Sequence, residues 1–220
     1  MRNFEGKMAI VTGGGTGMGR ELVRQLAAAR CHVAMCDVSP DNMMETERLA
    51  LSETTEEIRV TSHVCDVADE ADMLAFRSQV QARHGVEHVD LVFNNAGIGG
   101  GGSFVIDEDR MAWEKTFDVC WCGVYHGCRA FLPLVIRSEE GHIVNTSSIN
   151  GFWATVGPDV PHTAYWKQHL QRMLHGAKCM VEAKVQNIAV RNRVPHAAQG
   201  EDRAAVRHQA ALTALNLLLP

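Results

Sequence analysis

Apolar and polar positions along the chain follow two alternating patterns, which predict strands and helices in turn. Short apolar runs stopped by glycine or polar residues are typical of buried strands, and apolar residues three or four apart are typical of helices. Strands are expected at 8–11, 32–36, 58–64, 89–93, 142–146 and, more weakly, 185–190, and helices at 18–29, 41–51, 69–83 and, with one break, 107–135. Apolar strands between helices indicate a parallel sheet covered on both faces, so the predicted fold class is α/β, doubly wound.

The segment between the first expected strand and the first expected helix is rich in glycine, and it reads Thr12-Gly13-Gly14-Gly15-Thr16-Gly17-Met18-Gly19. Glycine permits a tight turn, lets the backbone approach a pyrophosphate and lets the helix pack close to the sheet. The helix N-terminus adds free N–H groups and a partial positive charge. A plain structural turn is the alternative, but the strand–turn–helix order favours a dinucleotide site. Its candidate residues are Gly13, Gly15, Gly17, Met18 and Gly19.

Asp37 ends the second expected strand, where a dinucleotide-binding fold carries the acid that binds the ribose. A carboxylate at this position accepts hydrogen bonds from the 2′-hydroxyl and repels a 2′-phosphate. No Lys or Arg follows at once, so the pattern favours NAD over NADP. The alternative is a surface aspartate that caps the next helix, a role that Ser39 could fill equally well.

Three further motifs follow the third, fourth and fifth expected strands, and they are Cys65-Asp66-Val67, Asn94-Asn95-Ala96-Gly97 and Thr146-Ser147-Ser148. Together with the glycine spacing of the first turn, they resemble the short-chain dehydrogenase/reductase family over about residues 4–165. The resemblance implies a Rossmann-type fold and NAD(P)-dependent oxidation of a small alcohol or reduction of a carbonyl compound. It also implies that five further residues contact the cofactor, namely Asp66, Val67, Asn94, Ala96 and Gly97.

The same resemblance implies a catalytic set of tyrosine, lysine, serine and asparagine. Tyr165 matches the tyrosine that acts as acid and base, and Ser148 matches the serine that polarises the substrate oxygen, with Ser147 as the fallback. A phenol has a pKa near ~10, so it needs a nearby cation to work at neutral pH. The family places a lysine four residues after the tyrosine, and this chain has His169 there.

Two of the four catalytic positions therefore depart from the family. Lys167 lies only two residues after Tyr165, so a regular helix would turn it away from the tyrosine. Cys120 stands where the family has its asparagine. The predicted function is an oxidoreductase of this family. The alternatives are a dinucleotide-binding protein with impaired or no turnover, and a truncated product.

Residues 1–220 are expected to form a single domain whose dinucleotide-binding core is 1–165. The segment 166–220 is atypical for the family and is expected to be mainly helical, with an amphipathic helix at 203–219. The family pairs its long helices between subunits, which leaves a homo-oligomer as one option for this chain.

Composition excludes several other classes of protein. The chain of 220 residues has 26 acidic and 21 basic residues and a formal charge of −5, which argues against nucleic acid as a partner. No apolar run approaches the ~18 residues of a membrane span, and the polar N-terminus has no signal-peptide core, so a cytoplasmic protein is expected. The seven cysteines and eleven histidines are scattered and form no metal motif, so free thiols and no metal site are expected.

Overall fold

The computed structural model describes residues 3–54, 57–100, 110–147 and 184–189. Its strands are β1 (Met8–Thr12), β2 (His32–Asp37), β3 (Val60–Val64), β4 (Leu91–Asn94), β5 (His142–Ser147) and β6 (Lys184–Ala189). Its helices are α1 (Gly17–Ala28), α2 (Pro40–Ser52), α3 (Glu70–His84), α4 (Arg110–Phe117) and α5 (Gly123–Val135), and the π-helical turn η2 (Asp118–Cys122) joins the last two. Ser148, Tyr165, Lys167 and His169 lie outside these residues, so the structure does not place them.

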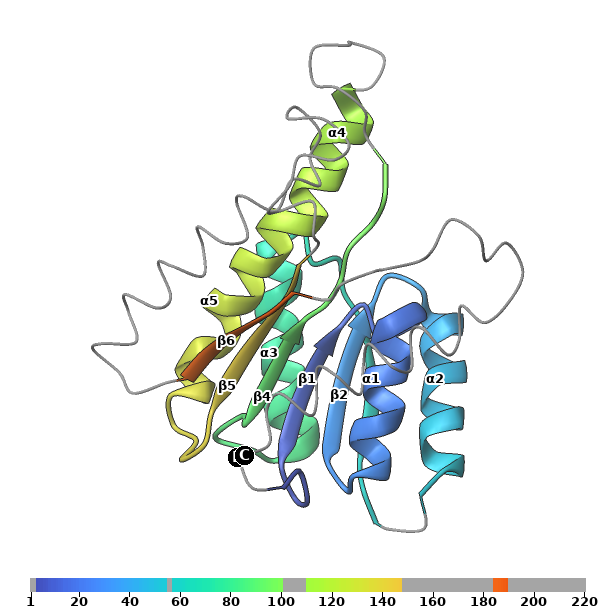
Figure 1. The fold of residues 1–220 in the computed structure, drawn as a ribbon, viewed down its shortest axis with the longest axis vertical. Helices are drawn as coiled ribbons and strands as arrows, with labels where there is room; N and C mark the ends of the chain where they lie inside the picture. Colours follow the sequence, from blue (N-terminus) through green and yellow to red (C-terminus); the bar gives the residue numbers. More distant parts are fainter. Residues whose placement is uncertain (1–2, 55–56, 101–109, 148–183, 190–220) are drawn as a thin grey trace.

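The described strands form one parallel sheet in the order β3-β2-β1-β4-β5-β6 (Figure 1). Ile10 of β1 lies opposite Ala34 of β2 on one side and opposite Val92 of β4 on the other. This order confirms the doubly wound α/β fold. The chain moves outward from β1 in both directions, and such a switch point opens a crevice at the carboxyl ends of the strands.

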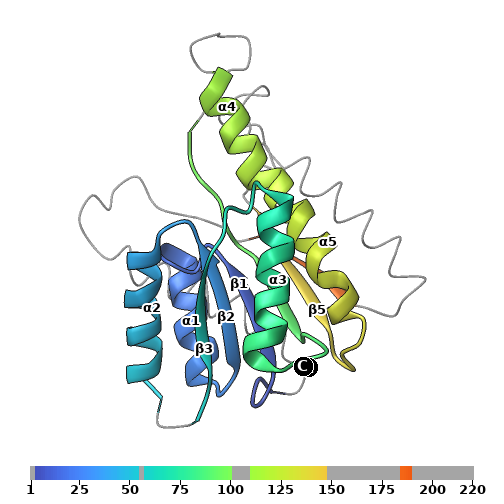
Figure 2. The ribbon, with the colours of Figure 1, turned by 180° about the vertical axis from the view of Figure 1, so that it is seen from behind.

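The core lies on both faces of the sheet, because successive side chains of a strand point to opposite faces. On β1, Ala9 and Val11 pack with the buried residues of α1 and α2, whereas Met8 and Ile10 pack with those of α3 and α5. Figures 1 and 2 show these two pairs of helices on opposite faces of the sheet. All five residues of β1 are buried, which explains why its sequence is a continuous apolar run.

The helix ends follow from local sequence. Ser39 caps α2 by accepting a hydrogen bond from Asn42 N–H, and Pro40 occupies the first position of that helix. Asp69 caps α3 by accepting from Ala71 N–H at 2.7 Å. The expected elements are confirmed to within two residues at most ends, and the break expected within 107–135 is the turn η2. In the segment 166–220, the weak strand expected at 185–190 corresponds to β6, and the division at residue 165 stays a prediction.

Candidate functional site

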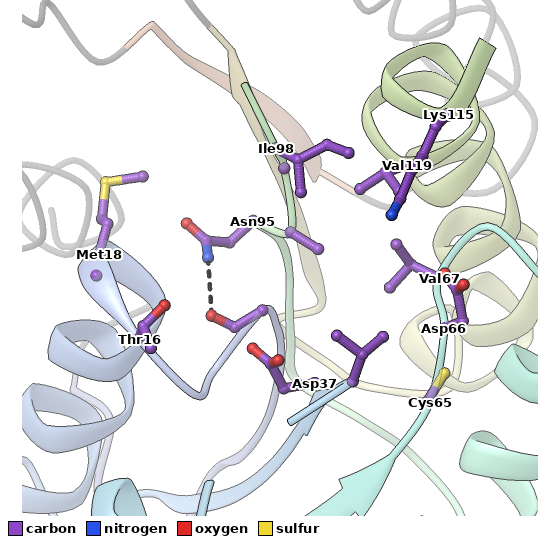
Figure 3. Close-up of a pocket in the computed structure, with 15 residues that line it drawn as sticks. Thr16, Met18, Asp37, Cys65, Asp66, Val67, Asn95, Ile98, Lys115 and Val119 are labelled. Carbon is purple, nitrogen blue, oxygen red and sulfur yellow. Dashed lines mark hydrogen bonds between the residues drawn. The ribbon is translucent and has the colours of Figure 1, made fainter. Parts of the chain in front are cut away.

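A cavity of about 630 Å³ lies at the carboxyl ends of the strands β1 to β4 (Figure 3). The glycine turn and the N-terminus of α1 form one wall, and α4 and η2 form the opposite wall. The segments that follow β2, β3 and β4 complete the cavity. It is lined by Gly13, Thr16, Gly17, Met18, Asp37, Val38, Cys65, Asp66, Val67, Asn95, Ala96, Gly97, Ile98, Lys115 and Val119.

The glycine turn has a shape that side chains would destroy. Gly13 has a φ of +68°, and a Cβ there would lie 2.8 Å from the Cα of Ala96. A Cβ at Gly19 would lie 2.0 Å from the carbonyl oxygen of Gly13. Gly19 does not line the cavity, but its missing side chain lets α1 begin directly against the turn. The turn is therefore a cradle in which added carbon atoms and a bound group would compete for space.

The N-terminus of α1 is open toward this cradle. Thr16 is the N-cap residue, but its side chain makes no capping hydrogen bond, and the first turn contains no acidic residue. By contrast, α3 has the capping carboxylate of Asp69 and two acidic residues in its first turn. The first N–H groups of α1 and its positive dipole end are thus left for an anion such as a phosphate.

Asp37 connects the end of β2 to the glycine turn. Its Oδ2 accepts a hydrogen bond from Gly15 N–H at 3.0 Å, and its Oδ1 accepts one from Ser39 N–H at 3.1 Å. A Cβ at Gly15 would lie 2.9 Å from that Oδ2, so Gly15 lies behind Asp37 rather than on the lining. Ser39 is the N-cap residue of α2, so Asp37 does not cap this helix. The carboxylate lines the cavity, where it can accept hydrogen bonds from hydroxyl groups.

The loop after β4 is tied to the end of β1. Thr12 Oγ1 accepts hydrogen bonds from the N–H groups of Asn95 and Ala96, both at 3.0 Å. The side chain of Asn95 donates to the carbonyl oxygen of Thr12 at 3.0 Å. It also donates to the carbonyl oxygen of Gly13 at 3.5 Å, the bond drawn in Figure 3. These bonds hold Ala96 and Gly97 against the glycine turn. Asn95 was part of the sequence motif but not a candidate residue, and the motif itself was the signal that pointed to it.

Asn94, a candidate residue, lies outside the lining. It is buried, and its Nδ2 donates to Asn145 Oδ1 at 2.7 Å and contacts Cys128 Sγ at 3.4 Å. Gly127 leaves room for it, because a Cβ there would lie 2.1 Å from Asn94 Oδ1. Asn94 therefore joins β4 to β5 and α5. Burial raises the pKa of the Cys128 thiol to about 12, so this thiol stays protonated at neutral pH.

The segment after β3 forms the third side of the cavity. Asp66 is exposed, and its Oδ1 accepts a hydrogen bond from Ala68 N–H at 2.9 Å. Val67 is buried against α5, where a Cβ at Gly123 would lie 2.7 Å from Val67 Cγ2. The carbonyl of Val67 is 3.0 Å from Nδ1 of His126. These contacts hold an acceptor and an apolar surface side by side at the cavity, and contact of Asp66 and Val67 with the cofactor stays a prediction.

Among the positions that the resemblance links to catalysis, the structure describes Cys120 and Ser147. Cys120 lies in η2, and its Sγ donates a hydrogen bond to the carbonyl of Ile98 at 3.5 Å. The thiol therefore lies beside the loop after β4, at the edge of the cavity. Ser147 ends β5, and its Oγ is buried without a hydrogen-bond partner in the described part of the chain. Ser148 is the next residue in sequence.

Eight candidate residues share the cavity: Gly13, Gly17, Met18, Asp37, Asp66, Val67, Ala96 and Gly97. Seven lining residues were not candidates: Thr16, Val38, Cys65, Asn95, Ile98, Lys115 and Val119. Most of these stand in or beside a motif. Lys115 and Val119 belong to the wall formed by α4 and η2, and no sequence pattern set them apart.

Metal ligands and membrane-spanning helices can be sought only in the described residues. Within them, no cluster of three or more His, Cys, Asp or Glu side chains is arranged to hold a metal ion. None of the helices in residues 3–54, 57–100 and 110–147 is both long and apolar enough to span a bilayer.

Two known proteins with sequences similar to this chain indicate what it is related to. A protein of Mycobacterium tuberculosis named "Putative oxidoreductase SadH" is 40% identical over 164 residues, which are 74% of this chain and 57% of that protein. Levodione reductase of Leifsonia aquatica is 32% identical over 148 residues, which are 67% of this chain and 54% of that protein. The chain thus spans a little more than half the length of these relatives.

A solved structure and a family model agree with this likeness. The crystal structure of a metagenomic short-chain oxidoreductase in complex with NADP has a TM-score of 0.77 and 25% identity, and the match covers 96% of this chain and 91% of that one. The family model described as short chain dehydrogenase matches residues 7–192, past the limit of about 165 seen in the motifs. The chain therefore belongs to the short-chain dehydrogenase family.

Proposed function

We propose that the chain binds a nicotinamide dinucleotide in this cavity and is built for hydride transfer between the nicotinamide and a small alcohol or carbonyl compound. One observation carries the proposal: the uncapped N-terminus of α1 faces a glycine turn that has no room for a Cβ at Gly13 or Gly19. Such a cradle suits a pyrophosphate. The relative solved with NADP and the relative named levodione reductase support the same chemistry.

Different residues at the cavity and at the adjoining N-terminus of α1 would bind different parts of the cofactor. The N–H groups of Gly17, Met18 and Gly19 would hold the pyrophosphate, and Asp37 would accept hydrogen bonds from the ribose hydroxyls. Asp66 and Val67 would hold the adenine. When bound, the nicotinamide supplies or accepts the hydride. The carboxylate of Asp37 would repel a 2′-phosphate, which supports NAD rather than NADP.

Turnover is expected to be slow. Tyr165 would be the acid and base and Ser148 the donor that polarises the substrate oxygen. Cys120 lies beside the cavity where the family has an amide, and a thiol is a much weaker hydrogen-bond donor and acceptor. His169 replaces the cation that would lower the pKa of the tyrosine. The position of Cys120 therefore favours a second candidate function, a dinucleotide-binding protein with impaired or no turnover.

Replacing Gly19 with valine tests the proposed site. The new Cβ would meet the Gly13 carbonyl oxygen and Asn95 Nδ2, so the turn must open and NADH binding should be lost. Binding is measured by the fluorescence of NADH on titration with the protein. Gly85→Ala is the control, because Gly85 ends α3 with a φ of +65° and its Cβ would meet nothing within 4 Å. It should cost about 1–2 kcal/mol of stability, because an L-residue is strained in the left-handed conformation, and leave binding unchanged. Equal NADH affinity in folded Gly19→Val and the unchanged protein would overturn the proposal.

A further inference from the structure

We infer that Lys115 determines the affinity for the adenine end of the dinucleotide by donating a hydrogen bond to a ring nitrogen of the base. The inference rests on the proposed function, because it requires a dinucleotide in the cavity. It adds a residue of α4 to the part of the site that Asp66 and Val67 form.

The charges on the cavity lining are few. Among the described residues of the lining, the charged side chains are those of Asp37, Asp66 and Lys115, so Lys115 is the one cation beside two carboxylates in this part of the chain. In Figure 3 the amino group of Lys115 points from α4 into the cavity, toward Val67. The wall with Thr16 and Met18 lies on the opposite side of the cavity.

Lys115 has no carboxylate partner in the described part of the chain. Its neighbour Arg110 on the same helix has one, because Arg110 Nε lies 3.0 Å from Glu114 Oε1. No ion pair or hydrogen bond from residues 3–54, 57–100 or 110–147 engages this ammonium group. It is therefore available to a bound molecule at no cost in broken ion pairs.

The position of Lys115 decides between base and phosphate. The phosphate cradle is at the N-terminus of α1, on the wall opposite α4 (Figure 3). Asp37, which would bind the ribose, lies between these two walls. Lys115 instead lies on the side of Asp66 and Val67, where the adenine would bind. The base is thus the part of the dinucleotide that this side chain meets.

The chemistry of the pair fits an adenine edge. Asp66 can only accept a hydrogen bond and Lys115 can only donate one. Adenine presents an amino donor beside ring-nitrogen acceptors. A carboxylate and an ammonium on the same side of a cavity therefore match both kinds of group.

The test compares three variants by NADH fluorescence and by calorimetric titration with ADP-ribose and with nicotinamide mononucleotide. Lys115→Met should weaken NADH and ADP-ribose by the same factor, about three- to tenfold, and leave the mononucleotide unchanged. Lys115→Gln keeps a neutral donor, so it should restore most of the affinity. Arg110→Met is the control on the same helix, and it should bind as the unchanged protein does. Thermal unfolding of each variant checks that it is folded.

Several outcomes would overturn the inference. If Lys115→Met binds ADP-ribose as tightly as the unchanged protein, the side chain makes no contact with the adenosine half. If Lys115→Gln is as weak as Lys115→Met and the loss shrinks at high salt, the contact is with a phosphate and not with the base. Failure of the unchanged protein to bind NADH at all would instead refute the proposed function.

Discussion

The free energy of unfolding should fall as the pH is lowered from 6.5 to about 4. The cause is a pair of buried histidines, His63 of β3 and His84 of α3. The side chain of Thr61 links His63 and His84, with Oγ1 3.0 Å from His63 Nε2 and 2.8 Å from His84 Nε2. His63 Nδ1 lies 2.9 Å from Gln79 Oε1, which can only accept. His63 therefore carries its proton on Nδ1, Thr61 donates to His63, and His84 donates to Thr61. Both imidazoles are neutral in this chain of hydrogen bonds.

The magnitude follows from the pKa of His84. Burial, followed by the charges of neighbouring groups with His32 first, lowers the pKa of His84 from 6.5 to about 4. Burial also lowers the pKa of His63. The unfolded chain therefore takes up a proton at a pH where folded His84 does not, so acid favours unfolding. The contribution of His84 is complete above pH 6.5, is smaller by about 2 kcal/mol at pH 5, and has fallen by about 3 kcal/mol below pH 4.

The assay is urea unfolding followed by circular dichroism at several pH values between 7.5 and 5. His84→Gln keeps an N–H that can donate to Thr61 but cannot take up a proton. The unchanged protein should therefore lose about 2 kcal/mol more than this variant over the range. His88→Gln is the control, since His88 is half exposed, and it should keep the full loss. Equal losses in the unchanged protein and His84→Gln would refute the reasoning.

The remaining predictions concern the cofactor and the reaction. Asp37→Ala combined with Val38→Arg should shift the ratio of the NAD and NADP dissociation constants toward NADP, and tighter binding of NADP by the unchanged protein would contradict our interpretation of Asp37. His169→Lys should raise the rate on a panel of alcohols and ketones, because a cation that persists at alkaline pH lowers the pKa of Tyr165. Tyr165→Phe should abolish whatever rate exists, and Lys167→Ala should change it little. A fast enzyme that loses its rate in Lys167→Ala would show that the helix geometry assumed after Tyr165 is wrong.

The centre of the sheet could be predicted from sequence because β1 and β4 are buried on both faces. Every residue of β1 is buried, and a short, continuous apolar run that ends at a glycine-rich turn is typical of such a strand. The exact ends of the strands are harder to predict from sequence. Val89 and Asp90 continue the pattern toward β4, yet the strand begins at Leu91, where pairing with β1 starts. Pairing depends on a partner strand far away in sequence, which a local pattern does not contain.

The two walls of the cavity also differ in how well the sequence predicts them. Gly13, Asp37 and Asp66 follow strands, so the rule that parallel strands bring their carboxyl ends to one edge was enough to bring them together. Lys115 and Val119 line the cavity because α4 and η2 extend beyond the carboxyl ends of the strands, where Figure 1 shows α4. The direction of that extension depends on packing and on the π-helical turn. The residues of α4 alone predict neither the packing nor the turn.

The proposed cofactor half and the proposed catalytic half of the site place different demands on the chain. At Gly13 and Gly19 the demand is steric, because a Cβ would collide with backbone atoms, so a substitution would disturb the turn itself. At position 120 the proposed demand is chemical, because the Cys120 thiol, which contacts the Ile98 carbonyl at 3.5 Å, is a weaker hydrogen-bond donor and acceptor than an amide. A chain can lose the second kind of residue and still fold and bind. Cofactor affinity and rate must therefore be measured separately, because intact affinity in this chain carries no information about turnover.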